Sequence, residues 1–239
     1  KHTTPKDGEP LYYLAVALKA QGRNDEAFDV FYKATWSAAW RAPAYYSLAE
    51  IACLRGDMAA ALGLADRALE ANALNVRALN LKAAVLRQLG RGNEALELLA
   101  SAFRKTDPLD ARAMAERWLA SKSPEAGKAL FSTLNEHPAT AVETAAEYLN
   151  AGLWQDGATV LSGAVDAARD KSRISPMVYY YLAHFAGRLG QPRRASEYYR
   201  LAASMPPDYV FPFEHEAIQV LWQAMRANPS DARAPYYLG

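Results

Sequence analysis

The stretch YYYLA at residues 179–183 has three close relatives in the chain: YYLA at 12–15, YYSLA at 45–49 and PYYLG at 235–239. The residue before the small one at the end of each stretch gives a common anchor. Leu14 and Leu48 are 34 residues apart, and so are Leu48 and Lys82. Later anchors are Thr144, Leu182 and Leu238, and the step from Thr144 to Leu182 is one period with four extra residues. A period of this length indicates a repeat architecture.

Small residues keep the same register after each anchor. Glycine eight residues on can take the left-handed conformation that ends a helix, and the other small residues allow two helix backbones to approach closely. The first column is Ala15, Ala49, Ala83, Ala145, Ala183 and Gly239, and the glycine column is Gly22, Gly56, Gly90, Gly152 and Gly190. Thirteen residues on are Ala27, Ala61, Ala95, Gly157 and Ala195, and twenty on are Ala34, Ala68, Ala102, Ala164 and Ala202.

Bulky apolar residues stand between these columns at helical spacing, for example Leu11, Leu14 and Leu18 in the first unit. Each unit is therefore expected to be a pair of antiparallel helices. Such a pair cannot bury its apolar face alone, so neighbouring pairs must stack. The pattern predicts an all-α chain.

This pattern resembles the tetratricopeptide repeat (TPR) family, whose 34-residue signature combines aromatic, Leu, Gly, Ala and Pro positions. The resemblance covers nearly the whole chain and implies a right-handed α-solenoid, a superhelix of stacked helix pairs, as a single domain over 1–239. Two departures are Ala in place of the usual Gly after the anchor, and a short unit at 110–137 that lacks the turn glycine. The expected units are 8–41, 42–75, 76–109, 110–137, 138–175 and 176–209.

The stretch MPPDYVFPF breaks the regularity at residues 205–213, because its prolines cannot lie inside a helix. We expect an extended linker at 205–213, a lone helix at 214–227 and the start of a truncated further repeat at 235–239. This region is also similar to the TPR part of large bacterial multidomain proteins that carry a carbohydrate-enzyme-like β-domain ahead of the repeats.

Composition excludes several function classes. The 239 residues are 51% hydrophobic and 22% charged, with a formal net charge of +1, so nothing points to nucleic acid or to an anionic membrane. No apolar run approaches the ~18 residues of a membrane span, and any targeting segment has been removed or lies upstream. The single cysteine, Cys53, excludes an intrachain disulfide and a multi-cysteine zinc site.

Catalytic and cofactor motifs are not found. The four histidines form no His-x3-His or HExxH pattern, and there is no phosphate-binding or dinucleotide-binding glycine loop. Glu143 and Glu147 share a helix face but are interpreted as a surface pair, and Cys53 as a structural thiol. We therefore expect neither an enzyme nor a cofactor.

The TPR resemblance implies that the first helix of each pair lines a concave groove. The matching positions in the first three units are Tyr12, Lys19, Tyr46, Glu50, Arg77, Asn80, Arg87 and Gln88, and in the sixth unit Tyr180, His184 and Arg188. Arg77, Asn80, Arg87 and Gln88 form a patch able to hold a carboxylate or a peptide backbone. The family's carboxylate-clamp pattern of Lys and Asn is absent from these positions.

Two functions remain open at this point. The first is a protein-interaction scaffold that binds a peptide or partner domain in the groove, with Tyr46, Arg77, Asn80, Arg87 and Tyr180 exposed. The second is a structural or oligomerisation appendage of a larger, carbohydrate-active multidomain enzyme, in which other domains of the same chain are the partners and the groove is occluded.

Overall fold

Five helices end at a glycine with a positive φ, between 68° and 79°: Gly22, Gly56, Gly90, Gly152 and Gly190. At the first of them, Gly22 N donates to Lys19 O at 2.9 Å and Arg23 N donates to Leu18 O at 3.0 Å. These two bonds satisfy carbonyl groups that the helix end would otherwise leave without donors. The same pair of bonds recurs at the other four glycines. The glycine column therefore ends the helices as expected.

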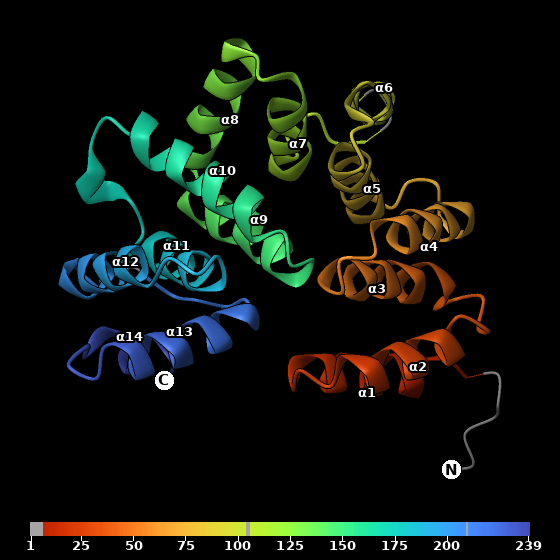
Figure 1. The fold of residues 1–239 in the computed structure, drawn as a ribbon, viewed down its shortest axis with the longest axis horizontal. Helices are drawn as coiled ribbons and strands as arrows, with labels where there is room; N and C mark the ends of the chain where they lie inside the picture. The colour runs from red at the N-terminus through yellow and green to blue at the C-terminus, as the bar shows by residue number, and fades with distance from the viewer. Residues whose placement is uncertain (1–6, 104–105, 209) are drawn as a thin grey trace. The chain divides into compact units, whose positions relative to one another are not determined.

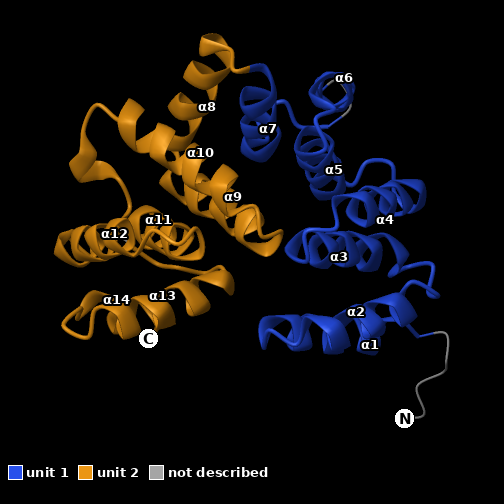
Figure 2. Cartoon of the chain, in the orientation of Figure 1, with its two compact units in different colours: residues 1–121 blue, residues 122–239 orange. Residues whose placement is uncertain are grey.

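The computed structural model describes residues 7–103, 106–208 and 210–239. Within these ranges the chain forms fourteen α-helices, one 3-10 turn and no strand, which confirms the all-α prediction (Figure 1). Two compact units, Lys1–Ser121 and Lys122–Gly239, divide the chain (Figure 2). The boundary between them falls inside the expected repeat 110–137, and the division of the chain into repeat units stays a prediction.

The described residues of unit 1 form seven helices. Successive helices pack as neighbours, α1 with α2, α3 with α4 and α5 with α6, followed by α7. Asp57 and Asn75 cap α4 and α5 by accepting hydrogen bonds from Ala60 N and Ala78 N. The helices are α1 (Glu9–Ala20), α2 (Asn24–Ala34), α3 (Arg41–Leu54), α4 (Met58–Ala71), α5 (Val76–Gln88), α6 (Gly92–Phe103) and α7 (Ala111–Ser121).

Unit 2 contains the other seven helices. The pairs α9 with α10, α11 with α12 and α13 with α14 pack together, and α13 also packs against α9 and α11. The helices are α8 (Pro124–Glu136), α9 (Pro138–Asn150), α10 (Trp154–Ala167), α11 (Pro176–Arg188), α12 (Pro192–Ser204), α13 (Glu216–Ala227) and α14 (Arg233–Tyr237). The 3-10 turn η1 (Lys171–Arg173) lies in the connection between α10 and α11.

The columns that hold alanine in most units lie in the cores of both units, whereas the turn glycines are exposed or half-buried. Ala15, Ala49, Ala83, Ala145 and Ala183 are fully buried. Two positions differ from the rest, because Ala102 is only half-buried and Gly239 is exposed. Where the unit 110–137 lacks its turn glycine, Lys122 takes the positive φ instead, at 54°.

Two irregular segments interrupt unit 2. Eight residues separate the end of α10 at Ala167 from the start of α11 at Pro176, and they include η1. Residues 205–208 and 210–215, between α12 and α13, form no helix, in agreement with the proline pattern. The four extra residues of the sequence period thus belong to the connection between α10 and α11. The expected linker belongs to the connection between α12 and α13.

Candidate functional site

Polar side chains connect successive first helices of unit 1. Lys19 Nζ of α1 lies 2.6 Å from Glu50 Oε2 of α3, and Tyr46 Oη donates to Glu50 Oε1 at 2.8 Å. Tyr46 and Glu50 meet because they are four residues apart on one helix. The set Lys19, Tyr46, Glu50, Arg77, Asn80, Arg87, Asp110, Arg112 and Glu116 is called the first-helix face below.

Arg77 stands in the first turn of α5, next to α3. Its guanidinium carbon lies 5.3 Å from the centroid of the Tyr46 ring. Arg77 is exposed, whereas Tyr46 is buried. The pair therefore joins α3 to α5 and leaves a cation at the surface, over a ring that Glu50 holds in place.

Glu116 of α7 is the acceptor between α5 and α7. Arg87 Nε donates to Glu116 Oε2 at 3.0 Å, and Arg112 Nη1 donates to Glu116 Oε1 at 3.0 Å. The Glu116 side chain is 1% exposed and that of Arg112 is 4% exposed. Removing Glu116 would leave buried guanidinium groups without this carboxylate, which costs more than the pair itself contributes.

Asn80 of α5 donates from Nδ2 to Asp110 Oδ1 at 2.9 Å. The same carboxylate oxygen accepts Ala113 N at 2.6 Å and so caps the start of α7. Asn80 is 2% exposed. Its amide group therefore holds helices together and is turned away from solvent.

The predicted groove residues of unit 1 differ in exposure. The expectation of exposed side chains is correct for Arg77 and wrong for Tyr46 and Asn80, because the adjacent first helices are close enough for their polar groups to pair. Tyr12 is half-buried against the Phe31 and Trp40 rings, with centroids 5.4 and 4.8 Å away. Arg87 is half-buried, and Gln88 is exposed at the end of α5.

The predicted residues of unit 2 serve the packing of that unit. Tyr180 is fully buried, so its expected exposure is also wrong, and its hydroxyl donates to Asp231 Oδ2 at 2.7 Å. Burial and the nearby Arg188 lower the pKa of His184 to about 4. Arg188 lies 4.6 Å from the Trp154 ring centroid. His184 is therefore neutral near pH 7.

Cys53 lies in unit 1 next to the first-helix face. It is 3% exposed, and burial, with Glu50 nearby, raises the pKa of its thiol to about 12. A thiol of that pKa carries almost no thiolate near neutral pH, which fits the interpretation of Cys53 as a structural thiol. The described residues also contain no group of three His, Cys, Asp or Glu side chains arranged to hold a metal ion.

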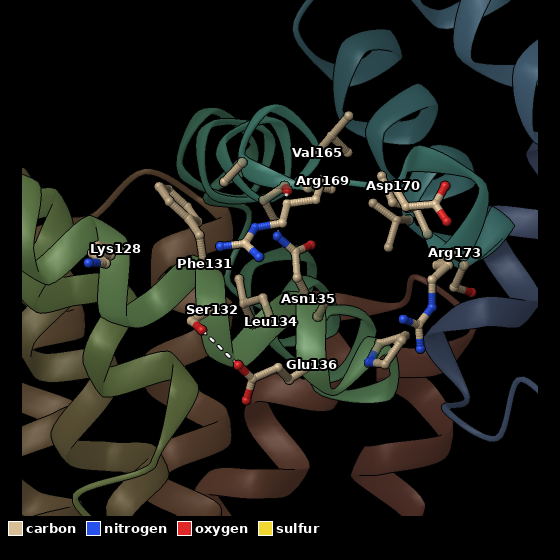
Figure 3. A pocket seen from close by; sticks show the side chains of 18 residues that line it. Lys128, Phe131, Ser132, Leu134, Asn135, Glu136, Val165, Arg169, Asp170 and Arg173 are labelled. Atoms are coloured by element: carbon tan, nitrogen blue, oxygen red, sulfur yellow. Dashed lines mark hydrogen bonds between the residues drawn. The ribbon is translucent and has the colours of Figure 1, made fainter.

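Sequence reasoning missed two cavities in unit 2. One, of about 620 Å³, lies between the ends of α8 and α10 and the starts of α9 and α11 (Figure 3). The other, of about 530 Å³, is lined by the α10–α11 connection, the starts of α9 and α11, and residues within 205–208 and 210–214. Both irregular segments were recognisable in the sequence, as extra residues and as prolines, but a break in a repeat does not say which segments meet.

No helix in the described ranges combines the length and the apolar character that crossing a lipid bilayer requires.

Residues 178–209 match the family model of the tetratricopeptide repeat. The match begins in the first turn of α11 and includes all of α12. The resemblance to this family is confirmed for that pair.

Solved structures with similar helix arrangements include MamA from Desulfovibrio magneticus RS-1, with 17% identity, TM-score 0.44, and coverage of 82% of this chain and 92% of that one. Pseudomonas aeruginosa PilF shows 19% identity and TM-score 0.48, over 89% and 96% of the two chains. A tetratricopeptide repeat protein from Parabacteroides merdae shows 15% identity and TM-score 0.46, over 95% and 89%. At these identities and TM-scores, no function or partner is transferred from these proteins.

Proposed function

We propose that this chain is a non-catalytic protein-interaction scaffold, and that the first-helix face of unit 1 binds a segment of a partner protein. The observation that carries the proposal is the exposed guanidinium of Arg77 over the buried Tyr46 ring, in a row of polar groups that connects four helices. Arginine and tyrosine are the residue types that contribute most to protein interfaces.

Hydrogen bonds already hold side chains of the first-helix face in place, which favours binding. Tyr46 is held by Glu50, and Glu50 is held by Lys19, so the ring under Arg77 has little freedom to lose when a partner arrives. Groups that are already fixed lower the entropic cost of association. Arg77 also lies in the first turn of α5, where the helix dipole favours a negatively charged ligand group. A carboxylate or a peptide carbonyl fits this position.

Catalysis by this face is not supported. The two groups that could act as nucleophile or base elsewhere, Cys53 and His184, lie in different units, and burial is the largest cause of both pKa shifts. The two glutamates of the first-helix face are held by basic side chains, Glu50 by Lys19 and Glu116 by Arg87 and Arg112. Such an arrangement suits a rigid binding surface better than proton transfer.

The test is an array of decapeptides that varies net charge and apolar content independently, probed with the labelled protein and with Arg77→Glu. Arg67→Glu is the matched control, because Arg67 also lies over a tyrosine ring, that of Tyr45 at 5.6 Å, but on the second helix α4. We expect Arg77→Glu to lower the affinity for the peptides that unit 1 binds by about tenfold or more, and tenfold is equivalent to ~1.4 kcal/mol.

The control variant should bind as the unaltered protein does. The proposal is wrong if Arg77→Glu and Arg67→Glu bind every peptide equally well. It is also wrong if the unaltered protein binds no peptide although its circular dichroism shows that it is helical.

Self-association, as a structural appendage of a larger multidomain protein, is a second candidate. The helix α13 exposes Ile218 and Trp222, 53% and 51% accessible, four residues apart on one side. A row of exposed apolar side chains is a feature of protein contacts. Light scattering across a concentration series should show dimers that Trp222→Ser abolishes, and a monomer at all concentrations rules this candidate out.

A further inference from the structure

The two cavities of unit 2 are neighbours. Pro138, Arg173, Ile174 and Ser175 line both of them. Volumes of about 620 and 530 Å³ lie in the range of cavities that hold ligands. The α10–α11 connection thus separates two adjoining hollows, called the Arg169 cavity and the Phe211 cavity below.

Positive charge is available in the Arg169 cavity. Lys128, Arg169 and Arg173 line it, and none of them forms an ion pair within the described part of the chain. Figure 3 shows Arg169 reaching from the α10–α11 connection toward Phe131 and Asn135 of α8. Arginine in such a position can bind a carboxylate through two parallel hydrogen bonds.

The two carboxylates of this cavity are already engaged. Glu136 Oε1 accepts Ser132 Oγ at 2.8 Å. Asp170 Oδ1 accepts both Ser172 N and Ser172 Oγ, and these bonds lower the pKa of Asp170, with a smaller effect from Arg173. Both carboxylates keep their negative charge, but the three basic side chains of the lining outnumber them, and this excess of positive charge favours an incoming negative group.

The Phe211 cavity is largely apolar. Val142, Ile174, Met177 and Met205 contribute to its wall. Phe211 and Phe213 also line it, although they are 79% and 71% exposed. Burial of rings this exposed under the apolar side chain of a ligand would stabilise the complex through the hydrophobic effect.

One polar atom in the Phe211 cavity lacks a partner. The Oε1 oxygen of Glu214 is buried and accepts no hydrogen bond. Burial raises the pKa of Glu214, and the nearby Glu143 and Glu216 contribute in the same direction. Glu214 thus adds an acidic residue, together with Asp208, to the wall of this cavity.

We propose that the Arg169 and Phe211 cavities together bind an extended segment of a partner protein, with an apolar side chain against Phe211 and Phe213 and an acidic side chain at Arg169 and Arg173. This site lies in unit 2 and is separate from the first-helix face of unit 1. A polypeptide is favoured over a nucleic acid because Asp208 and Glu214 line the apolar half, where a phosphate chain would be repelled.

The experiment measures fluorescence anisotropy with labelled decapeptides and the full chain. Four probes are used: an acidic peptide with a central Leu-Phe pair, the same peptide with Asn and Gln in place of its acids, the same peptide with Ser in place of Leu-Phe, and single-stranded oligo-dT. The variants are Arg169→Glu with Arg173→Glu, and Phe211→Ser with Phe213→Ser.

Matched controls come from the same unit. Arg200→Glu replaces an exposed arginine whose Nε bonds to Ser196 O of its own helix, and Tyr236→Ser replaces a ring that is 64% exposed. Arg77→Glu reports on the first-helix face, so failure of one site is distinguishable from failure of the other.

We expect the acidic Leu-Phe peptide to bind the unaltered protein, and each double variant to bind it about tenfold or more weakly. The unaltered protein should show a similar loss of affinity for the peptides in which the acids or the Leu-Phe pair are replaced. The controls should leave it unchanged. The inference is overturned if the unaltered protein does not bind this peptide, if the double variants bind as the controls do, or if oligo-dT binds more tightly than the peptide.

Discussion

At the scale of single residues, burial determines what the titratable side chains can do. Cys53 and His184 are both withdrawn from water, and in each case the charged form is the one that burial disfavours. The thiol stays protonated and the imidazole stays neutral near pH 7. Both residues are therefore reporters of folding.

Cys53 should react with a thiol reagent only after unfolding. Its 3% exposure and a pKa raised to about 12 leave almost no accessible thiolate at pH 8. We expect no release of thionitrobenzoate from the folded protein during the time in which the urea-unfolded protein is labelled completely. Rapid labelling of the folded protein would contradict the burial of this helix position.

Because of His184, the free energy of unfolding should be lower in mild acid than at neutral pH. In the unfolded chain its pKa is near 6.5, and in the folded protein it is about 4, so between these values the unfolded chain binds more protons. The free energy of unfolding should therefore fall as the pH is lowered from about 6.5 to about 4, by on the order of 3 kcal/mol.

The control is His184→Gln, which cannot titrate. Urea unfolding at a series of pH values should show that the free energy of unfolding of this variant falls less between about pH 6.5 and about pH 4 than that of the unaltered protein. Arg188 lowers the pKa of His184, and a hydrogen bond with Gln223 partly opposes that effect. Parallel profiles of the two proteins would show that folding does not lower the pKa of His184.

At the scale of helices, small residues decide how closely neighbours pack. Gly157 of α10 lies in the column where the other units have alanine. A Cβ atom at this position would lie 2.6 Å from Phe185 Cε2 and 3.0 Å from Tyr148 Cβ. Both rings are fully buried and cannot move aside into solvent.

Gly157→Ala should therefore destabilise the protein by ~1–3 kcal/mol. Gly63→Ala is the matched control, because a Cβ atom there meets nothing within 4 Å. In that exposed helix position alanine should stabilise by ~0.5–1 kcal/mol. Thermal unfolding of both variants measures the two effects, and the same sign for both would contradict the packing around Gly157.

At the scale of the whole molecule, each unit has its own buried side chains. In unit 1, Ala83, Leu86, Ala95, Leu99 and Ala113 form one cluster. In unit 2, Tyr148, Tyr181 and Phe185 are fully buried. Stacked repeats lose stability mainly where they are altered, since each repeat contacts only its neighbours.

Hydrogen exchange should show this local response. In Gly157→Ala, the amides of α9, α10 and α11 should exchange faster, while those of α1, α2 and α3 keep the rates of the unaltered protein. Equal acceleration in all helices would indicate that the chain unfolds as a single cooperative unit, and the measurement needs only peptide-level resolution.

The sequence predicted the helical character and the turn glycines correctly, because both follow from local chemistry. A glycine at a positive φ ends a helix wherever the sequence places it. The expected exposure of Tyr46, Asn80 and Tyr180 was wrong for a different reason. Helical periodicity says which face a side chain is on, but it does not say how close the next helix lies.

Periodicity by itself determined that this chain consists of stacked helices, because a 34-residue period and its small-residue columns are properties of residue order. Only the tertiary structure decided which polar groups meet across helices, as at Glu50 and Glu116, and how far each groove residue is exposed, as for Arg77 and Asn80. It also placed the two irregular segments of unit 2 around adjoining cavities. The physical reason is that hydrogen bonds and cavities depend on distances of a few ångströms between residues far apart in sequence.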